Sequence, residues 1–324
     1  AWAGALAGNA SSPGFLARAA MVCWLGAAFA RRVEDAGVGH VHAHYATHPA
    51  LAAWVVRRLT GTPYSFTVHA HDLYVKRPML RRKVREAAFV RAISRYNRDL
   101  LARLYGRDAE RTVVIHTGTD PDRFRPRPRA RRDGPFTCVC VASLQDYKGQ
   151  RYLIEACARL RDAGRPLRCL LVGEGEERPR LEALVRRLGL EDVVAFCGAH
   201  PAERVAETVA SADVAVLPSV TTRSGKQEGI PVALMEALAA GVAVVASRLS
   251  GIPELVEDGV GGLLVPQRDP AALAAALARL QDDPMLRRSL AANGRRRVLE
   301  AFDLRRNAAA LAAQLARVER EGPA

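Results

Sequence analysis

Two glutamates, Glu228 and Glu236, bracket the segment EGIPVALME. The segment lies between an apolar run ending in Pro218 and another over residues 242–246, so we expect the order strand, loop, helix, strand. Pro231 fits the first helical position, and the free backbone N–H groups after it would favour an anion such as a diphosphate. Carboxylates beside a diphosphate are repelled unless they accept hydrogen bonds from sugar hydroxyls. This spacing therefore predicts a site for a nucleotide-activated sugar. The residues expected at its helix start are Gly229, Ile230, Pro231 and Val232.

An isolated pair of glutamates at this spacing is more often a surface loop acid and a helix-dipole partner. The surrounding sequence favours the functional interpretation. Residues 228–265 read EGIPVALMEALAAGVAVVASRLSGIPELVEDGVGGLLV. Together with residues 138–198, this stretch closely resembles the retaining glycosyltransferases of family 4, which have the two-domain GT-B fold. The segments AHDLY and HAHYATHP resemble colanic acid and exopolysaccharide enzymes of that family in particular.

The resemblance implies a specific activity. A hexose would pass from a nucleotide-diphosphate sugar, UDP-sugar or GDP-sugar, to a saccharide or lipid-linked acceptor with retention of configuration. The leaving phosphate itself can accept the acceptor's proton in such a mechanism, so no protein general base is named. We expect no resident cofactor and no metal, because a lysine and a helix start would stabilise the leaving diphosphate.

The loop after the strand expected at 136–142 carries Lys148. The resembling enzymes hold the donor diphosphate there with an arginine and a lysine. Lys148 matches the lysine, whereas Ser143 stands where the arginine is usual. A hydroxyl cannot replace a guanidinium fork, so Arg223 or Lys226, in the loop before Glu228, is a candidate for the missing charge.

A glycine pair, Gly173 and Gly175, follows another expected strand. The third glycine of a dinucleotide fingerprint is absent because Arg178 occupies that position. A simple tight turn is therefore one interpretation. The resemblance instead places this turn beside the nucleotide, with Cys197 and Gly198 near the base.

Histidines gather in the first half of the chain. His69 closes an expected strand, where ligands of open parallel sheets usually bind. The resemblance assigns it to the transferred sugar, as the third catalytic candidate with Glu228 and Lys148, and gives His71 and Asp72 secondary roles. A metal-dependent hydrolase built on His69 and His71 is an alternative. Only two of the eight histidines lie beyond residue 71, so carboxylates would have to supply most of its other ligands.

The positive charge is unevenly distributed. Residues 1–134 carry 23 Lys and Arg against 10 Asp and Glu, whereas residues 135–324 carry 25 against 24. The partner of such a field is nucleic acid, an anionic membrane surface or an acidic substrate. We expect no nucleic acid, because no recognised binding module accompanies the charge. Residues 76–91 form either a basic amphipathic helix against lipid headgroups or a solvated face with its apolar stripe in the core.

The cysteines and one apolar run indicate the cellular compartment in which the protein is expected. The six cysteines lack a C-x-x-C pattern, which is typical of free thiols in a reducing compartment. The run at 19–30 is shorter than the roughly 20 residues that span a bilayer, and its spacing predicts an amphipathic helix. We therefore expect a cytoplasmic protein, peripheral on the inner face of the plasma membrane if the lipid interpretation holds.

Expected strands and helices alternate throughout, which predicts an α/β fold with parallel sheets. A chain of 324 residues that is 49% hydrophobic suits two Rossmann-sized cores. The expected class is GT-B, with two Rossmann-like doubly wound domains facing a cleft. The chain begins at Ala1 without Met and offers four strand candidates before residue 117, so we expect the first domain to lack its start.

The boundaries follow from the same pattern. Strands are expected near 38–44, 64–69, 89–94 and 112–116, then near 136–142, 168–172, 193–197, 213–218, 242–246 and 263–265. The expected domains are an N-terminal acceptor-side domain over 1–128, a linker over 129–135, a nucleotide-sugar domain over 136–302 and a tail helix over 303–324 that packs back toward the first domain.

Three functions are consistent with the sequence. A glycosyltransferase of cell-surface polysaccharide biosynthesis is the favoured one. A non-catalytic fragment that binds sugar nucleotides is consistent with Ser143 and with the missing start. The metal-dependent hydrolase is the third.

Overall fold

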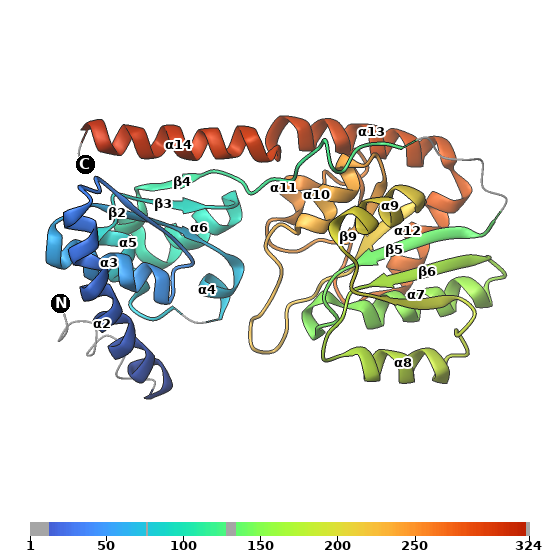
Figure 1. Cartoon of the computed structure of the whole chain (residues 1–324). Helices are drawn as coiled ribbons and strands as arrows, with labels where there is room; N and C mark the ends of the chain where they lie inside the picture. Colours follow the sequence, from blue (N-terminus) through green and yellow to red (C-terminus); the bar gives the residue numbers. More distant parts are fainter. Residues whose placement is uncertain (1–12, 76, 128–133, 322–324) are drawn as a thin grey trace. The chain divides into compact units, whose positions relative to one another are not determined.

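The computed structural model describes residues 13–75, 77–127 and 134–321, without the side chains of residues 13–17 and 71. The chain divides into two compact units, one of residues up to 116 together with those from 308 onward, the other of residues 117–307. Each unit contains one parallel sheet with helices packed on it (Figure 1). The α/β class with two Rossmann-like units is therefore confirmed.

The first unit is built on four parallel strands in the order β1-β2-β3-β4. Its core contains the fully buried side chains of Trp54, Tyr64, Phe66 and Leu101. The four strand candidates of the sequence are confirmed within a few residues. The elements are α2 (Pro13–Asp35), β1 (Val41–His44), α3 (His48–Thr60), β2 (Tyr64–Val68), α4 (Ala70–Tyr74), α5 (Leu80–Glu86), β3 (Phe89–Ala92), α6 (Arg95–Tyr105), the 3-10 turn η1 (Gly106–Ala109) and β4 (Thr112–Val114).

Only part of the basic segment at 77–91 is helical. Helix α5 covers only residues 80–86, and its apolar side chains Leu80 and Val84 are buried in the core. Lys83 is buried as well, and its ammonium donates hydrogen bonds to the backbone carbonyls of Ala46 and Thr47. Burial lowers the pKa of Lys83 to about 7, against the attraction of Asp72. The apolar stripe of this segment therefore belongs to the core.

Helix α2 has one buried and one exposed apolar face. Ala19, Cys23, Ala30 and Val33 are buried on the side that packs on α3. Large apolar side chains on the opposite side are exposed: Met21, Trp24, Leu25 and Phe29. Their spacing places them on one stripe of the helix. Among the residues described, no helix combines the length and apolar character needed to cross a membrane.

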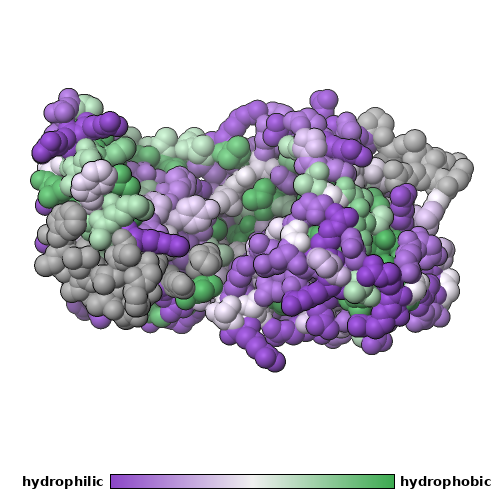
Figure 2. Space-filling view, turned by 60° about the horizontal axis from the view of Figure 1, so that its bottom comes forward, coloured by the Kyte–Doolittle hydropathy of each residue, from purple (hydrophilic) through white to green (hydrophobic). Residues whose placement is uncertain are grey.

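The second unit is a doubly wound domain with a six-stranded parallel sheet in the order β10-β9-β8-β5-β6-β7. Helices α7, α8 and α12 pack on one face and α9, α10 and α13 on the other (Figure 1). Hydrophilic residues predominate on the face of this unit seen in Figure 2. Its strands are β5 (Phe136–Val141), β6 (Leu167–Val172), β7 (Val194–Gly198), β8 (Val214–Leu217), β9 (Ala243–Ser247) and β10 (Leu263–Val265). Its helices are η2 (Asp146–Lys148), α7 (Gln150–Asp162), α8 (Arg178–Arg187), α9 (Ala202–Ser211), α10 (Val232–Ala239), α11 (Ile252–Leu255), α12 (Pro270–Asp282) and α13 (Pro284–Ala301), with α14 (Leu304–Glu321) continuing into the first unit.

The boundary between the units lies earlier than the sequence pattern indicates. Phe124, at the start of the Pro-rich stretch, is buried in the core of the second unit. Thr119 forms a bridge with Asp303 in the same unit. Most of the expected linker at 129–135 lies outside the described residues. In the first unit, Val318 of α14 packs with Ala88 and Phe89.

The cysteines are free, as expected from their pattern. Cys197 is half-buried and the other five are buried. The sulfur atoms of three of them lie within 4.8 Å of one another in the second core, contributed by Cys138, Cys157 and Cys169. These side chains are fully enclosed by apolar neighbours, which is typical of cysteine as a small core residue.

Candidate active site

The ion pair between Lys148 and Glu228 is the centre of the candidate site. Lys148 ends η2, in the loop after β5, and Glu228 lies in the loop after β8. The Nζ atom of Lys148 is 2.6 Å from Oε2 of Glu228, and each side chain is only 14% exposed. Burial alone would lower the pKa of Lys148, but the Glu228 carboxylate and its hydrogen bond raise it above the ordinary value. The structure thus brings together, at the carboxyl ends of adjacent strands, two residues 80 positions apart.

Close contact of the two loops holds this pair. Gly149 has φ +73°, and a Cβ atom there would lie 2.0 Å from the carbonyl oxygen of Pro218. The N–H of Val220 donates to the carbonyl of Tyr147 at 2.8 Å. Only glycine permits this approach, because a side chain would both strain the backbone and collide with the neighbouring loop.

The start of α10 lies directly after Glu228. Its first helical residue is Val232, and Pro231 is the N-cap. The helix therefore begins one residue later than the sequence predicts. Ser250 fixes the preceding loop, since its hydroxyl lies 2.6 Å from the carbonyl oxygen of Glu228 and 3.0 Å from that of Gly229. Ile230 is buried in the second core.

The helix start is open to an anion. The N–H groups of Leu234 and Met235 donate to the Pro231 carbonyl. Within the described residues, no hydrogen-bond acceptor is recorded for the N–H groups of Val232 and Ala233. The Val232 side chain is exposed, so the helix end is accessible. Two free donors and the helix dipole together favour a negatively charged ligand here.

Glu236 lies one turn into α10, on the face that Val232 exposes. Burial raises the pKa of its carboxyl to about 7, although Arg123 acts in the opposite direction. The carboxyl forms no hydrogen bond or ion pair with the described residues. A carboxyl that is half neutral near pH 7 can both donate and accept hydrogen bonds, which suits sugar hydroxyls.

Gly173 and Gly175 have a structural reason for lacking side chains. Cβ atoms at these positions would lie 2.0 Å from the Ala142 carbonyl oxygen and 2.3 Å from that of Leu144. They allow the loop after β6 to pack directly against the loop that carries Ser143. The structure therefore supports the turn interpretation of the glycine pair, and contact with a nucleotide remains a prediction.

The remaining candidates of the second unit flank this edge of the sheet. The Ser143 side chain is exposed, and its carbonyl accepts a hydrogen bond from the Gln150 side chain at 2.9 Å. Cys197 and Gly198 end β7 and are half-buried. The Gly198 carbonyl accepts the N–H of Gly173 at 2.8 Å, so the β6 and β7 loops are joined.

The sequence did not single out Tyr147. Its ring centre lies 4.9 Å from Nζ of Lys148 and 4.4 Å from Nζ of Lys226. An aromatic residue next to a lysine is too common a pattern to predict such a contact without knowing how the loops pack.

His69 lies in the first unit, directly after β2. Burial, together with His44 and Arg91, lowers its pKa to about 4, so the imidazole is neutral near pH 7. Its Nε2 atom is buried and lacks a hydrogen-bond partner in the described part of the chain. A buried ring nitrogen without a partner requires an explanation, and contact with a ligand is one.

Asp72, which has a secondary role in the sequence-based expectation, binds backbone groups of the first unit. It is 1% exposed. One carboxylate oxygen accepts the N–H of His69 at 2.9 Å, and the other accepts the N–H of Ala46. Asp72 therefore holds the backbone that presents His69. The side chain of His71 lies outside the described part.

The hydrolase alternative requires a metal centre. Across the described residues, only the cysteine trio brings three potential ligand atoms close together. His69 belongs to no such group among these residues, which do not include the His71 side chain, so the histidine-based hydrolase stays untested.

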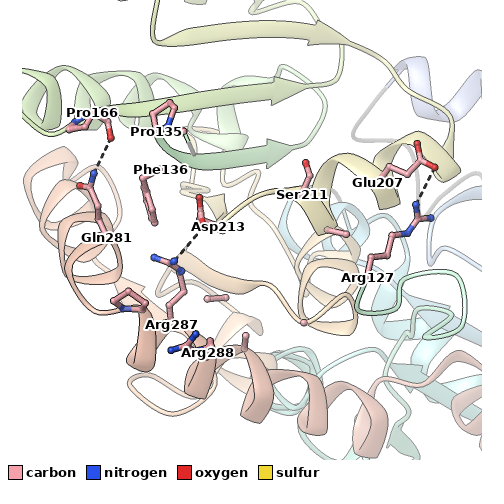
Figure 3. A pocket seen from close by; sticks show the side chains of 16 residues that line it. Arg127, Pro135, Phe136, Pro166, Glu207, Ser211, Asp213, Gln281, Arg287 and Arg288 are labelled. Atoms are coloured by element: carbon pink, nitrogen blue, oxygen red, sulfur yellow. Dashed lines mark hydrogen bonds and ion pairs between the residues drawn. The ribbon is translucent and has the colours of Figure 1, made fainter. Parts of the chain in front are cut away.

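A cavity of about 770 Å³ lies at the amino ends of the strands of the second sheet (Figure 3). Phe136 and Asp213 line it at the amino ends of β5 and β8. Arg287 lies over the Phe136 ring and pairs with Asp213 at 3.4 Å. Because ligands of parallel sheets bind at the carboxyl ends, we interpret these contacts as structural.

Comparison with protein-family models identifies the chain. Residues 122–297 match the family described as "Glycosyl transferases group 1", and residues 7–123 match "Glycosyltransferase Family 4". The chain belongs to the group 1 glycosyl transferases. The family resemblance noted in the sequence is therefore confirmed.

Two curated relatives carry names from polysaccharide biosynthesis, and a third acts on D-inositol 3-phosphate according to its name. WcaL of Escherichia coli (strain K12), named for colanic acid biosynthesis, is 45% identical over 52% of this chain and 42% of its own length. The amylovoran biosynthesis glycosyltransferase AmsK of Erwinia amylovora is 41% identical over 54% and 43%. A D-inositol 3-phosphate glycosyltransferase of Geodermatophilus obscurus is 33% identical over 91% and 70%. The chain thus spans less than half the length of the first two relatives.

Solved structures share the fold. Sucrose-phosphate synthase from Thermosynechococcus elongatus is 28% identical, with a TM-score of 0.77 over 90% of this chain and 76% of that one. Anabaena HepE, solved with UDP-glucose, is 24% identical, with a TM-score of 0.74 over 90% and 82%. These likenesses place both units in the GT-B class.

Replacing Gly173 with alanine tests the packing role of the glycine turn. We expect Gly173→Ala to lower the free energy of unfolding by at least about 3 kcal/mol, because it combines backbone strain with a collision. Gly164→Ala is the matched control: Gly164 has φ +69° but open space around it, so a loss of about 1 kcal/mol is expected. Urea unfolding measures both. Equal losses in the two variants would show that the Gly173 contact is unimportant.

The raised pKa of Glu236 predicts a pH dependence of stability. The unfolded carboxyl ionises near its ordinary value of 4.5 and the folded one near 7. Its stabilising effect is complete below the unfolded pKa and is lost as pH rises through the folded pKa. Relative to Glu236→Gln, the wild type should lose on the order of 1–3 kcal/mol of unfolding free energy between about pH 5 and about pH 8.

Chemical unfolding across that pH range gives the measurement. Glu257→Gln, at an exposed position, is the control and should parallel the wild type. A constant difference between wild type and Glu236→Gln would contradict the raised pKa.

Proposed function

We propose that the chain is the catalytic part of a retaining glycosyltransferase of cell-surface polysaccharide biosynthesis. A hexose would be transferred from UDP-sugar or GDP-sugar to a saccharide or lipid-linked acceptor. The observation that carries the proposal is the buried Lys148–Glu228 pair beside the open start of α10. Lys148 and the free N–H groups of α10 would bind the diphosphate. The two glutamates would accept hydrogen bonds from the hydroxyl groups of the attached sugar.

The leaving group needs stabilisation in the transition state. As the bond between the anomeric carbon and the phosphate oxygen breaks, negative charge develops on the diphosphate. Lys148 and the N–H groups of Val232 and Ala233 are the donors proposed to meet it. A lysine and a helix dipole suffice in this scheme, so we propose transfer without a metal ion.

Retention follows if the acceptor attacks from the face that the diphosphate leaves. The acceptor oxygen then bonds to the anomeric carbon, and its proton passes to the departing phosphate oxygen. No protein general base is required. Glu228 would exchange part of its contact with Lys148 for sugar hydroxyls when the donor binds.

The relatives support the substrate class. WcaL and AmsK carry names from polysaccharide biosynthesis. A relative in Mycolicibacterium smegmatis, 34% identical over 79% of this chain, is named as a GDP-mannose-dependent mannosyltransferase. Both UDP- and GDP-sugars therefore remain in the proposal.

A non-catalytic sugar-nucleotide-binding role is the second candidate. The exposed Ser143, where an arginine is usual, favours it. The two candidates differ in turnover, because a binding protein would retain UDP or GDP affinity without transferring sugar.

Substitution of the two glutamates tests the enzyme proposal. Glu228→Ala should lower transfer by about 100-fold or more, because a charged contact to the reacting sugar is lost. Glu236→Ala should mainly weaken donor binding. Radiolabelled UDP-glucose and GDP-mannose with a lipid-linked saccharide acceptor provide the assay, and Glu257→Gln is the control. Undiminished transfer by Glu228→Ala would refute its assignment.

We also propose that the protein works in the cytoplasm, peripherally on the inner face of the plasma membrane. The free thiols fit a reducing compartment. Helix α2, and not α5, presents the apolar side chains that could enter the headgroup region, with Trp24 64% and Phe29 59% exposed. Arg18, Arg31 and Arg32 on the same helix are exposed and complement anionic lipid.

Vesicle binding tests the α2 surface. Replacing Trp24 and Phe29 together with serine should weaken binding to phosphatidylglycerol vesicles by about tenfold or more, because two large apolar groups no longer enter the lipid. Met285→Ser, at an exposed apolar position of the second unit, is the matched control. Co-sedimentation is the measurement. Equal binding by the double variant and the wild type would rule out this surface.

A further inference from the structure

Two ammonium groups lie against one aromatic ring in the second unit. Nζ of Lys226 is 4.4 Å from the ring centre of Tyr147, and Nζ of Lys148 is 4.9 Å from it. The two nitrogens can therefore be no farther apart than these two distances added together. A diphosphate that accepts a hydrogen bond at each end can reach two ammonium groups up to that far apart.

The two lysines differ in their charge partners. Lys148 is paired with Glu228. Lys226 donates to the neutral side-chain oxygen of Gln145 at 3.2 Å. No carboxylate pairs with Lys226 within the described residues. Two like charges with one carboxylate leave the cluster positive, and an anion between them would relieve their repulsion.

A formed turn presents Lys226. The Lys226 carbonyl accepts hydrogen bonds from the N–H and the hydroxyl of Thr222. Gly225 has φ +81° and donates its N–H to the Thr222 carbonyl at 3.0 Å. The turn is tied to the rest of the unit, because the N–H of Thr221 donates to the Gln267 side chain at 2.7 Å. Hydrogen bonds within the turn, and from the turn to Gln267, thus fix the backbone that carries Lys226.

We propose that Lys226 is the second cation of the donor site and contacts the terminal phosphate of a bound nucleoside diphosphate. Tyr147 is a positioning residue that holds both ammonium groups. Lys226 thereby supplies, from a different loop, the charge that Ser143 cannot. The inference rests on the proposed function, because it assumes that the diphosphate binds at the start of α10.

Arg223 is the rival source of this charge. It lies in the same loop and lines a cavity of about 470 Å³ together with Gln145 and Thr222. Its side chain is exposed, and it has no ring contact with Tyr147 among the described residues. The geometry therefore favours Lys226.

Calorimetric titration of the chain with UDP, UMP and uridine, and with the guanosine series in parallel, tests the proposal. Lys226→Gln should weaken binding of the preferred diphosphate about tenfold, because one charge-assisted hydrogen bond is lost. Binding of the monophosphate should weaken less, and nucleoside binding should not change. Tyr147→Phe should retain diphosphate affinity and Tyr147→Leu should weaken diphosphate binding, since only the first keeps the ring.

Two further variants complete the design. Arg204→Gln removes one exposed positive charge elsewhere on the unit and should bind the diphosphate like the wild type. Arg223→Gln should also match it. Thermal unfolding of every variant checks that the fold is intact.

The outcomes separate the two proposals. Equal weakening of diphosphate, monophosphate and nucleoside by Lys226→Gln, no weakening, or a diphosphate-specific loss in Arg223→Gln alone would overturn the role of Lys226 and leave the proposed function standing. Failure of the wild type to bind any of these nucleotides would overturn both.

Discussion

The contact between the β5 and β8 loops is the constraint on which the candidate site depends. It places a lysine and a glutamate at hydrogen-bond distance although they are far apart in the sequence. Gly149 makes the contact feasible, because any side chain would collide with the backbone after β8. The pair is largely shielded from water, so its mutual attraction is stronger than that of a surface pair. A substrate that enters must therefore replace this interaction with comparable ones.

The start of α10 is surrounded by groups that attract an anion and by groups that repel one. The free N–H groups and Lys148 favour an anion, whereas Glu228 and Glu236 would oppose one. Burial keeps Glu236 partly protonated near pH 7, which reduces that opposition. The Lys148–Glu228 pair is neutral as a unit. In this arrangement the acids can remain close to a diphosphate and still offer oxygen atoms to its sugar.

Apolar runs and their alternation predicted the strands of both units, because burial on both faces of a parallel sheet leaves a clear pattern. Local signals failed where tertiary packing decides. The spacing of charged and apolar residues predicted a helix over 76–91. Only α5, at 80–86, is helical, and its Lys83 is buried. Phe124 begins a Pro-rich stretch, so the sequence did not predict that its side chain packs in the second core. Asp72 gave no sign in the sequence that it holds two backbone N–H groups.

The site was partly predictable for similar reasons. Family resemblance identified Lys148 and Glu228, but their pairing depends on loop contacts between strands distant in the sequence. The lysine pair around Tyr147 could not be found from spacing at all, since Lys226 and Tyr147 are brought together by two separate turns. The α10 start was found within one residue, because proline is compatible with both the N-cap and the first helical position.

A crystal structure of the chain with a bound UDP- or GDP-hexose would locate the donor relative to the Lys148–Glu228 pair. We expect the diphosphate at the N–H groups of Val232 and Ala233, with Lys148 in contact and the carboxyl groups of Glu228 and Glu236 on sugar hydroxyls. A nucleotide sugar bound elsewhere, with the Lys148–Glu228 pair and the α10 start unoccupied, would contradict it.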